Sequence, residues 1–403
     1  MGEKFWKTFY FSNTAIALFL VIDGAFLFLY AQTLGVSASE ARQFFYGEDA
    51  IGKLLRFSVS ILGQNNVGIR APFILAHLIN TALVYVVARE HVRRSDAVIA
   101  MLLFMLLPGI NSAALLVSSA PFIMCAALLC VWLYSRSEIL AIALLFALAM
   151  IDNIFIVLNL AVACFEIYKK RYRIAVLLFL FMTLSYVFYG FEVSGRPRGY
   201  FPDIFGLYGA IFSPFVFCFF VYTIYWGIFK SSERLSLLWF VSSVAFMLSI
   251  VLSLRQNLPI EDYAPFAAIG APLIVKAFMN SWRIRLPQFR KGYITLAAVM
   301  IGSLLLFDAL IFVHKPLYIL MSKSGKHFAR EHHFVGELAS RLKAMGIDSI
   351  ECDSERLAAR LKFYGIASGG DHAITRNKPS GESIELTFDV LGYTAATYYL
   401  SPK

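Results

Sequence analysis

The chain has 403 residues, of which 59% are hydrophobic and only 15% are charged. A soluble globular protein has about 45–50% apolar and roughly 25% charged residues, so this composition excludes a soluble enzyme, a disordered protein and a disulfide-stabilised scaffold. The formal net charge of +10 does not indicate nucleic-acid binding, because the basic residues lie in short clusters between apolar stretches. The sequence therefore predicts an all-α polytopic membrane bundle.

Eleven hydrophobic segments follow one another along the chain. They cover residues 12–32, 67–88, 96–111, 117–134, 138–151, 154–168, 173–191, 207–229, 235–254, 263–281 and 292–314. A helix needs about 20 apolar residues to cross the hydrocarbon of a bilayer. The fifth and sixth segments are shorter than this and meet at Asp152 and Asn153, so we expect a broken or re-entrant pair buried within the bundle.

The distribution of lysine and arginine predicts the orientation of the chain in the membrane. Basic clusters lie at Lys4 and Lys7, at Arg89, Arg93 and Arg94, at Arg136, at 169–173, at Lys230 and Arg234, and at 283–291. All of them fall on one side if the N-terminus is cytoplasmic and all eleven segments cross, as the positive-inside rule requires. The interpretation is a multi-pass protein of the plasma (inner) membrane, with its first segment kept as an anchor.

Two domains follow from this topology: a transmembrane domain over residues 1–315 and an extracytoplasmic α/β domain over residues 316–403. The outer loop, residues 33–66, belongs to the first and is expected to contain two short amphipathic helices, because residues 39–46 and 51–61 mix charged and apolar residues at helical spacing. In the C-terminal domain, the pattern predicts helices over 334–345 and 355–364 and strands over 348–352, 383–389 and 393–400.

Acids and arginines gather on the predicted outer side. The acids are Glu40, Glu48, Asp49, Asp152, Glu261 and Asp262, and the arginines are Arg196, Arg198 and Arg255. A carboxylate can act as a general base, and a guanidinium binds two phosphate oxygens at once. The alternative interpretation is that these are ordinary solvated loop charges.

The start and end of the second hydrophobic segment carry a more specific pattern. Gly63, Asn65, Arg70 and Pro72 fit G-x-N-x-x-x-x-R-x-P, and residues 84–89 read V-Y-V-V-A-R. This pattern resembles the polyprenyl-phosphate-sugar-dependent glycosyltransferases of the C-type membrane fold, which include glycosyltransferase family 39 and the aminoarabinose transferases. Residues 255–265 and 354–364 are similar to two later parts of that family. The family's first outer loop begins with an Asp-Glu-Ala-like motif, where this chain has Ser39, Glu40 and Ala41.

The resemblance implies an inverting membrane glycosyltransferase that moves a sugar from a polyprenyl-phosphate or diphosphate donor to a lipid, glycan or protein acceptor. It implies Glu40 as general base, and burial against residues 44–46 is expected to raise the pKa of Glu40. From their place later on the same loop, Asp49 and Glu48 are the reserve candidates, and Asp152 is a third option if the broken helix pair brings it under the loop. The residues predicted to bind substrate are Glu48, Arg70, Arg196, Arg198 and Arg255. No cofactor, metal or nucleic acid is expected. Because Ser39 replaces the family's acid, a non-catalytic or transporter-like protein on the same scaffold stays open as an alternative.

Several polar residues have structural interpretations instead. Asp23 lies midway along the first segment, so it should face protein or water. His77 is expected to be a hydrogen-bonded packing residue, and Arg70 to orient the outer loop by pairing with its acids. The run His327, Glu331, His332 and His333 leaves a metal site open as the less favoured alternative.

Overall fold

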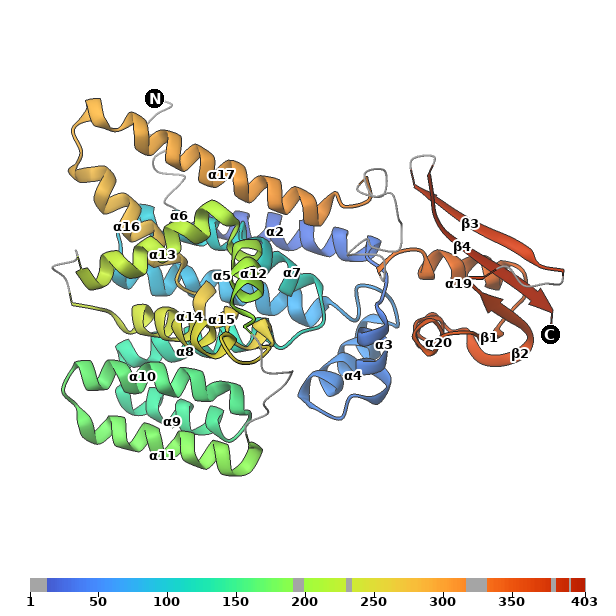
Figure 1. Cartoon of the computed structure of the whole chain (residues 1–403), viewed down its shortest axis with the longest axis horizontal. Helices are drawn as coiled ribbons and strands as arrows, with labels where there is room; N and C mark the ends of the chain where they lie inside the picture. Colours follow the sequence, from blue (N-terminus) through green and yellow to red (C-terminus); the bar gives the residue numbers. More distant parts are fainter. Residues whose placement is uncertain are drawn as a thin grey trace. The chain divides into compact units, whose positions relative to one another are not determined.

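The chain forms a bundle of apolar helices and a small C-terminal sheet (Figure 1). The structure is a computed structural model and describes residues 13–190, 199–229, 234–316, 332–377, 382–390 and 393–402. The chain divides into two compact units. The first holds residues 1–24, 75–114 and 118–308, and the second holds residues 25–74, 115–117 and 309–403.

The helices of the first unit follow the predicted hydrophobic segments. They are α5 (Ala71–His91), α6 (Arg94–Met105), α7 (Pro108–Leu115), α8 (Ala120–Arg136), α9 (Glu138–Ala149), α10 (Ile156–Tyr168), α11 (Tyr172–Tyr189), α12 (Phe201–Phe212), α13 (Pro214–Phe229), α14 (Leu237–Ser253), α15 (Ala264–Ala268), α16 (Ala271–Ile284) and α17 (Lys291–Phe312). Short 3₁₀ turns lie between them: η1 (Asn153–Phe155), η2 (Ile260–Asp262) and η3 (Pro287–Phe289). α2 (Asn13–Thr33), α5 and α17 each contribute residues to both units.

Three of the eleven predicted segments are each made of two helices. α6 and α7 are bent by 59°, and α12 and α13 by 105°, while α15 and α16 are separate elements. Pro108 begins α7 and Pro214 begins α13, and proline cannot donate the backbone hydrogen bond that would continue the preceding helix. At the sharper bend, Ser213 adopts a left-handed conformation with φ 66°, and its hydroxyl lies 3.0 Å from the Ser303 hydroxyl.

Length and apolar composition identify five described helices that can cross a membrane, or up to seven if each bent pair counts as one span. Four further described helices are apolar but shorter: α8, α9, α14 and the η1–α10 segment. The chain is thus a multi-pass membrane protein, whereas the eleven crossings and their orientation stay predictions. The expected break at Asp152 and Asn153 is present as η1, and α9, α10 and α11 lie side by side (Figure 1).

The second unit contains the outer-loop helices α3 (Ala38–Tyr46) and α4 (Ala50–Leu62), which confirm the two helices predicted for this loop. It also contains α19 (Val335–Ala344), α20 (Glu355–Phe363) and the strands β1 (Ser349–Cys352), β2 (Ala367–Thr375), β3 (Ile384–Val390) and β4 (Tyr393–Pro402). The predicted domain boundary between residues 315 and 316 lies close to residue 309, where the last stretch of the second unit begins. The outer loop was predicted to belong to the transmembrane domain, but it lies in the same compact unit as the C-terminal residues.

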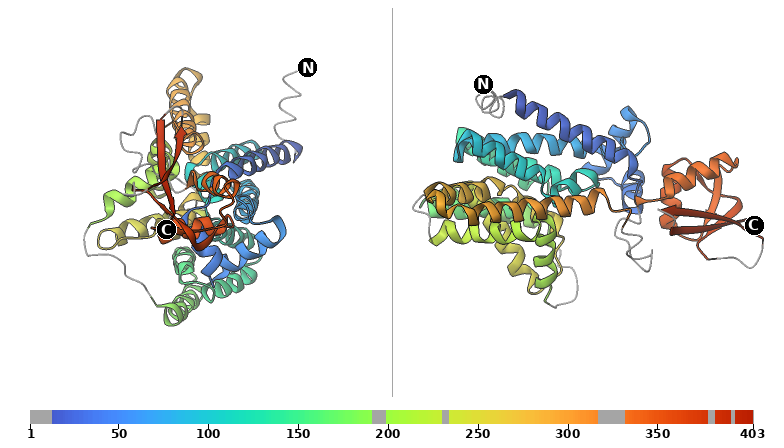
Figure 2. Two further views of the ribbon diagram at one scale, coloured as in Figure 1. Left: turned by 90° about the vertical axis from the view of Figure 1, so that its right-hand side faces the viewer. Right: turned by 90° about the horizontal axis from the view of Figure 1, so that it is seen from above.

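The sheet has the order β1-β2-β4-β3, in which β1 and β2 are parallel and the other pairs are antiparallel. α19 and α20 pack on it (Figure 2), and their leucines form one core with alternate residues of the strands, such as Leu386, Phe388, Tyr398 and Leu400. This alternation is the strand period of two, which is why β1, β3 and β4 were predictable from the sequence.

The strand β2 was not predicted. Its sequence contains Gly369 and Gly370, both with positive φ, and the pairing with β1 shifts register between Ile350 and Glu351. A Cβ at position 370 would lie 2.5 Å from Oγ of Ser349, so only glycine allows the two strands to approach. Two glycines in a strand remove the apolar alternation on which the prediction depended.

Candidate functional site

The acidic motif of the outer loop begins a helix. Ser37 caps the N-terminus of α3: its hydroxyl accepts a hydrogen bond from the Glu40 backbone N–H at 3.2 Å, and Oε2 of Glu40 accepts one from the Ser37 N–H at 2.8 Å. This reciprocal pair is a capping box, which a serine followed three residues later by glutamate specifies locally. The side chain of Glu40 is therefore turned back onto the backbone, while Ser39 is exposed.

Arg70 completes the environment of Glu40. Its Nη2 lies 3.1 Å from Oε2 of Glu40, and the two side chains are 0% and 4% exposed. The same guanidinium donates to the backbone carbonyls of Leu115 (2.7 Å), Asn66 (3.0 Å) and Gly35 (2.9 Å). The predicted structural role of Arg70, pairing with an outer-loop acid, is confirmed. Arg70 is also predicted to bind substrate, but its side chain has no exposed surface that a substrate could contact.

The pKa of Glu40 does not follow the expectation. Burial by itself raises the pKa, but the charges of Arg70 and His332 and the hydrogen bonds from Ser37 more than offset it, so the pKa of Glu40 is held below its ordinary value. Its Oε1 also accepts from the Val117 N–H at 3.4 Å. The expectation of a raised pKa is thus wrong, because an arginine from a distant segment enters the same buried space. A buried carboxylate of this kind is a poor proton acceptor.

The C-terminal residues of the second unit hold the outer loop on both sides of α3 and α4. The hydroxyl of Tyr364 accepts from the Val36 N–H at 3.0 Å and donates to Oδ1 of Asn66 at 2.6 Å. Further bonds run from Nε of Arg360 to the Val36 carbonyl (3.0 Å), from Nε2 of Gln64 to the Phe363 carbonyl (2.6 Å) and between Nδ1 of His332 and the Gly35 carbonyl (3.0 Å). The segment 354–364, singled out in the sequence, thus positions the loop that carries Glu40.

The reserve acids of the outer loop have different surroundings. Asp49 caps α4 by accepting from the Gly52 N–H at 3.1 Å, and it also accepts from Nε2 of Gln43 at 2.6 Å. Glu48 is exposed. The structure gives Asp49 a capping role, and its catalytic role stays a prediction.

Substituting Asp49 separates these two roles. Asp49→Asn keeps a side-chain oxygen for the cap, so we expect unchanged stability and unchanged activity, whereas Asp49→Ala should lower stability by about 0.5–2 kcal/mol. Thermal unfolding and turnover of the two variants, each compared with the wild type, check this. A loss of turnover in stable Asp49→Asn would instead assign Asp49 to the chemistry.

A second group of acids lies in the first unit. Asp152 caps η1 through the Ile154 N–H at 3.0 Å. Asp262 ends η2, and burial, followed by the nearby charges of Asp152 and Glu261, raises its pKa to about 6. The sequence placed Asp152 among the candidates for the general base, and it placed Asp262 among the outer-side acids without choosing it as a base. The signal for Asp262 was its place in the segment 255–265, between two helices and next to Tyr263.

The predicted phosphate-binding arginines are only partly described. Arg196 and Arg198 lie outside the described residues, and Arg255 is exposed at the C-terminal end of α14. Their part in substrate binding stays a prediction.

Two pairs of polar side chains join helices of the first unit. Nε2 of His77 lies 2.7 Å from Oδ2 of Asp23, which confirms that Asp23 faces protein and that His77 is a hydrogen-bonded packing residue. Asp308, which the sequence analysis did not consider, accepts from Nδ2 of Asn111 at 2.9 Å. Each pair joins two helices, as expected for polar groups that must be satisfied away from water.

The histidines considered for a metal are also engaged in the described part of the chain. Nε2 of His333 lies 2.5 Å from Nε2 of His314, and the two rings are stacked. His327 and Glu331 lie outside the described residues. Among the residues that the structure describes, no group of three or more histidine, cysteine or acidic side chains is arranged to hold a metal ion.

Comparison with known proteins gives a match at the level of structure. No family model matches the sequence, and no curated protein matches it. Among solved structures, ArnT from Cupriavidus metallidurans in the apo state matches with a TM-score of 0.56 and 11% identity over 91% of this chain and 85% of that one. The same protein bound to undecaprenyl phosphate matches with a TM-score of 0.57 and 10% identity over 96% of this chain and 98% of that one. At such identities the match shows the fold alone, and by that measure the chain has the C-type transferase fold that the resemblance predicted.

Proposed function

We propose that this chain is a membrane glycosyltransferase that uses a sugar linked to a polyprenyl phosphate as its donor. The observation that carries the proposal is the match over nearly the whole length of both chains to ArnT bound to undecaprenyl phosphate. Such a match includes the outer loop and the C-terminal domain as well as the helices. The orientation predicted from the basic clusters puts the reaction on the outer side of the plasma membrane.

The chemistry needs a proton acceptor, a nucleophile and a leaving group. An acceptor hydroxyl attacks the anomeric carbon, its proton passes to a carboxylate, and the bond between that carbon and the phosphate oxygen breaks to release the polyprenyl phosphate. Among the described acids outside the apolar helices, we assign the proton acceptor to Asp262, because its pKa of about 6 lies above that of an ordinary aspartate. Glu40 is paired and capped, so it acts by positioning the outer loop.

An apolar groove in the first unit suits the hydrocarbon part of such a donor. It has a volume of about 400 Å³ and lies on α10, α13 and α14, where it is lined by side chains that include Leu160, Ile228, Val244 and Met247. Small-molecule sites occupy about 300–1,000 Å³ and are mostly apolar. A polyprenyl chain can bury apolar surface there without requiring polar partners.

The proposal is tested by donor binding and by turnover. The purified protein should retain undecaprenyl phosphate in native mass spectrometry, and Val244→Trp, which fills the groove, should weaken this binding about tenfold. Leu180→Trp on the exposed side of α11 is the matched control. Incubation with a mixture of polyprenyl-phosphate sugars should release free polyprenyl phosphate.

Two results would contradict the proposal. Equal retention by Val244→Trp and the control would remove the groove as the donor site. If the wild-type chain bound the donor but did not turn it over in any lipid mixture, the interpretation as an enzyme would be replaced by that of a non-catalytic protein on the same scaffold. The presence of Ser39 where the family has an acid favours this non-catalytic interpretation over a transporter.

A further inference from the structure

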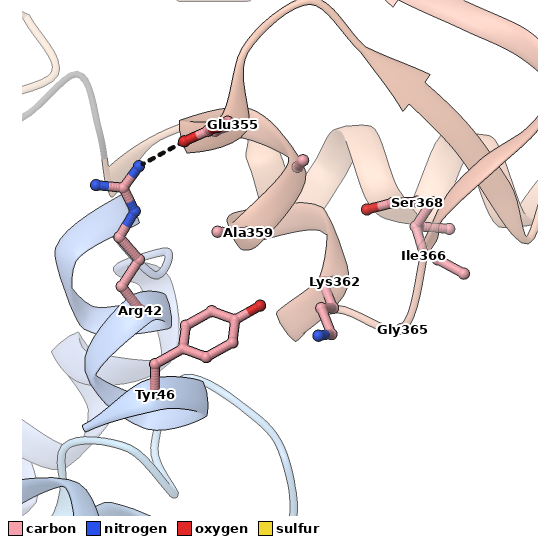
Figure 3. A pocket seen from close by; sticks show the side chains of 10 residues that line it. Arg42, Tyr46, Glu355, Ala359, Lys362, Gly365, Ile366 and Ser368 are labelled. Atoms are coloured by element: carbon pink, nitrogen blue, oxygen red, sulfur yellow. Dashed lines mark hydrogen bonds and ion pairs between the residues drawn. The ribbon is translucent and has the colours of Figure 1, made fainter. Parts of the chain in front are cut away.

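A cavity of about 590 Å³ lies in the second unit, between α3 and the segment formed by α20 and the start of β2 (Figure 3). It is separate from the buried contacts of Glu40, although α3 contributes to both. Its charged and aromatic lining consists of Arg42, Tyr46, Glu355 and Lys362. We propose that this cavity binds an anionic saccharide.

The floor of the cavity is made by small residues. Ala358, Ala359, Gly365 and Ala367 line it, together with Ile366 and Ser368. Side chains of this size leave the backbone accessible, so a flat ring can lie close to it. The volume suits a ligand of one to three sugar rings, because small-molecule sites occupy about 300–1,000 Å³.

The aromatic wall is exposed. Tyr46 is 68% exposed, and Nζ of Lys362 lies 5.5 Å from the centre of its ring and 4.6 Å from that of Phe45. The ammonium group thus lies over part of the Tyr46 ring, while most of the Tyr46 side chain stays accessible to a ligand. An exposed tyrosine offers an apolar face and a hydroxyl together, which matches the mixed apolar and polar faces of a sugar.

The charges of the cavity favour an anion. Arg42 and Lys362 line it, and Nζ of Lys343 comes within 3.1 Å of where a Cβ of Gly365 would stand. The nearby acid is Glu355, whose carboxylate meets Arg42 at 3.5 Å with side chains 95% and 51% exposed. An ion pair this exposed contributes little stability, so a ligand carboxylate or phosphate can replace Glu355 as the partner of Arg42 and bind both of its nitrogens.

The cavity lies on α3, the helix that begins with the Ser37–Glu40 capping box. Arg42 and Tyr46 follow Glu40 by two and six residues, and a helix rises 1.5 Å per residue, so the cavity lies within roughly 9 Å along the helix from the acidic motif. If the proposed function holds, the saccharide is the acceptor. Binding itself does not require the transferase reaction.

Isothermal titration of the full-length protein in nanodiscs tests the proposal with three probes. Trigalacturonate carries both the rings and the charges, maltotriose carries only the rings, and inorganic phosphate carries only charge. We expect trigalacturonate to bind at least tenfold more tightly than either of the others, and its affinity to fall as salt screens the charges. Arg42→Ala and Lys362→Ala should each weaken it by about 10-fold to 100-fold, and Tyr46→Ala should weaken trigalacturonate but not phosphate.

Arg376→Ala removes a cation from the same unit outside the cavity, where the guanidinium lies over Tyr398, and should leave binding unchanged. Thermal unfolding establishes that each variant is folded, which the exposure of Arg42, Tyr46 and Lys362 leads us to expect. The proposal is overturned if maltotriose or phosphate binds as well as trigalacturonate, if trigalacturonate does not bind, or if Arg42→Ala and Lys362→Ala bind like Arg376→Ala. Donor turnover is measured separately, so a transferase that binds no trigalacturonate refutes this site and leaves the proposed function standing.

Discussion

Replacing Arg70 with methionine is expected to destabilise the protein by roughly 3–5 kcal/mol, because it removes one partner of a buried ion pair. The side chain of Glu40, which is only 4% exposed, would lose its arginine partner and keep only His332, whose Nδ1 lies 3.7 Å from Oε2 of Glu40. The carbonyls of Gly35, Asn66 and Leu115 would each lose a donor. Thermal unfolding in detergent, together with protease cleavage within residues 33–66, measures the loss.

The matched control is Arg42→Met, which removes an exposed partner from a surface pair and should change stability little. Adding Glu40→Gln to Arg70→Met removes the buried charge that has lost its arginine partner and should recover part of the loss. If Arg70→Met were as stable and as resistant to protease as Arg42→Met, the pair would not hold the outer loop.

The pair also has a signature in the pH dependence of stability. The pKa of Glu40 lies below its ordinary value of 4.5 in the folded protein, so the stabilisation is present above pH 4.5 and is lost as the pH falls through the folded pKa. Arg70→Met removes the largest charge that lowers this pKa, so the pKa of Glu40 in the folded variant lies closer to its ordinary value. Acidification should therefore destabilise the variant less than it destabilises the wild type.

The second large effect is expected at Asp262. If its carboxylate accepts the proton of the attacking hydroxyl, Asp262→Asn should retain the fold and lower the turnover of donor by about 10²–10⁴-fold. With a pKa of about 6, the base is deprotonated above pH 6, and kcat/KM should fall about tenfold for each pH unit below it. Steady-state turnover between pH 4.5 and pH 8 measures both effects.

Asp152 provides the test that separates a base from a merely structural acid. Its negative charge helps to raise the pKa of Asp262, so Asp152→Asn should move the acidic limb of the profile to lower pH while keeping activity at neutral pH. Glu40→Gln serves as the comparison at the residue first predicted to be the base. Full turnover in Asp262→Asn, or an unchanged acidic limb in Asp152→Asn, would assign the proton transfer to another group.

The first predictions succeeded where the signal is local. A capping box is complete within one turn, so Ser37 and Glu40 carry a local signal for the start of α3, although the helix over residues 39–46 was predicted from its mixed charged and apolar residues alone. The amphipathic outer-loop helices and three of the four strands likewise follow from residue periodicity. Periodicity failed at two kinds of residue. The two glycines of β2 hid a strand, and the prolines that begin α7 and α13 each divide a predicted single segment into two helices.

The chemistry of the site was harder to predict from the sequence, because the pKa of each acid depends on residues that are distant in the sequence and close in the folded chain. The sequence identified Glu40 as a candidate base, but its pKa is determined by Arg70, and Val117 supplies a further hydrogen bond from another segment. Asp262 acquires its raised pKa partly from Asp152, which belongs to a different part of the chain. Neither shift can be obtained from neighbours in the sequence.

By itself, the sequence determined that this chain is a multi-pass helical protein with an outer loop of two helices and a small C-terminal α/β domain. Backbone groups in a bilayer must be satisfied within their own segment, so apolar stretches become helices whatever surrounds them. Only the tertiary structure decided that the outer loop belongs with the C-terminal residues, that Glu40 is paired with Arg70, and that Arg42, Tyr46 and Lys362 line one cavity. Burial and charge act through space, and the distances that decide them are set by packing.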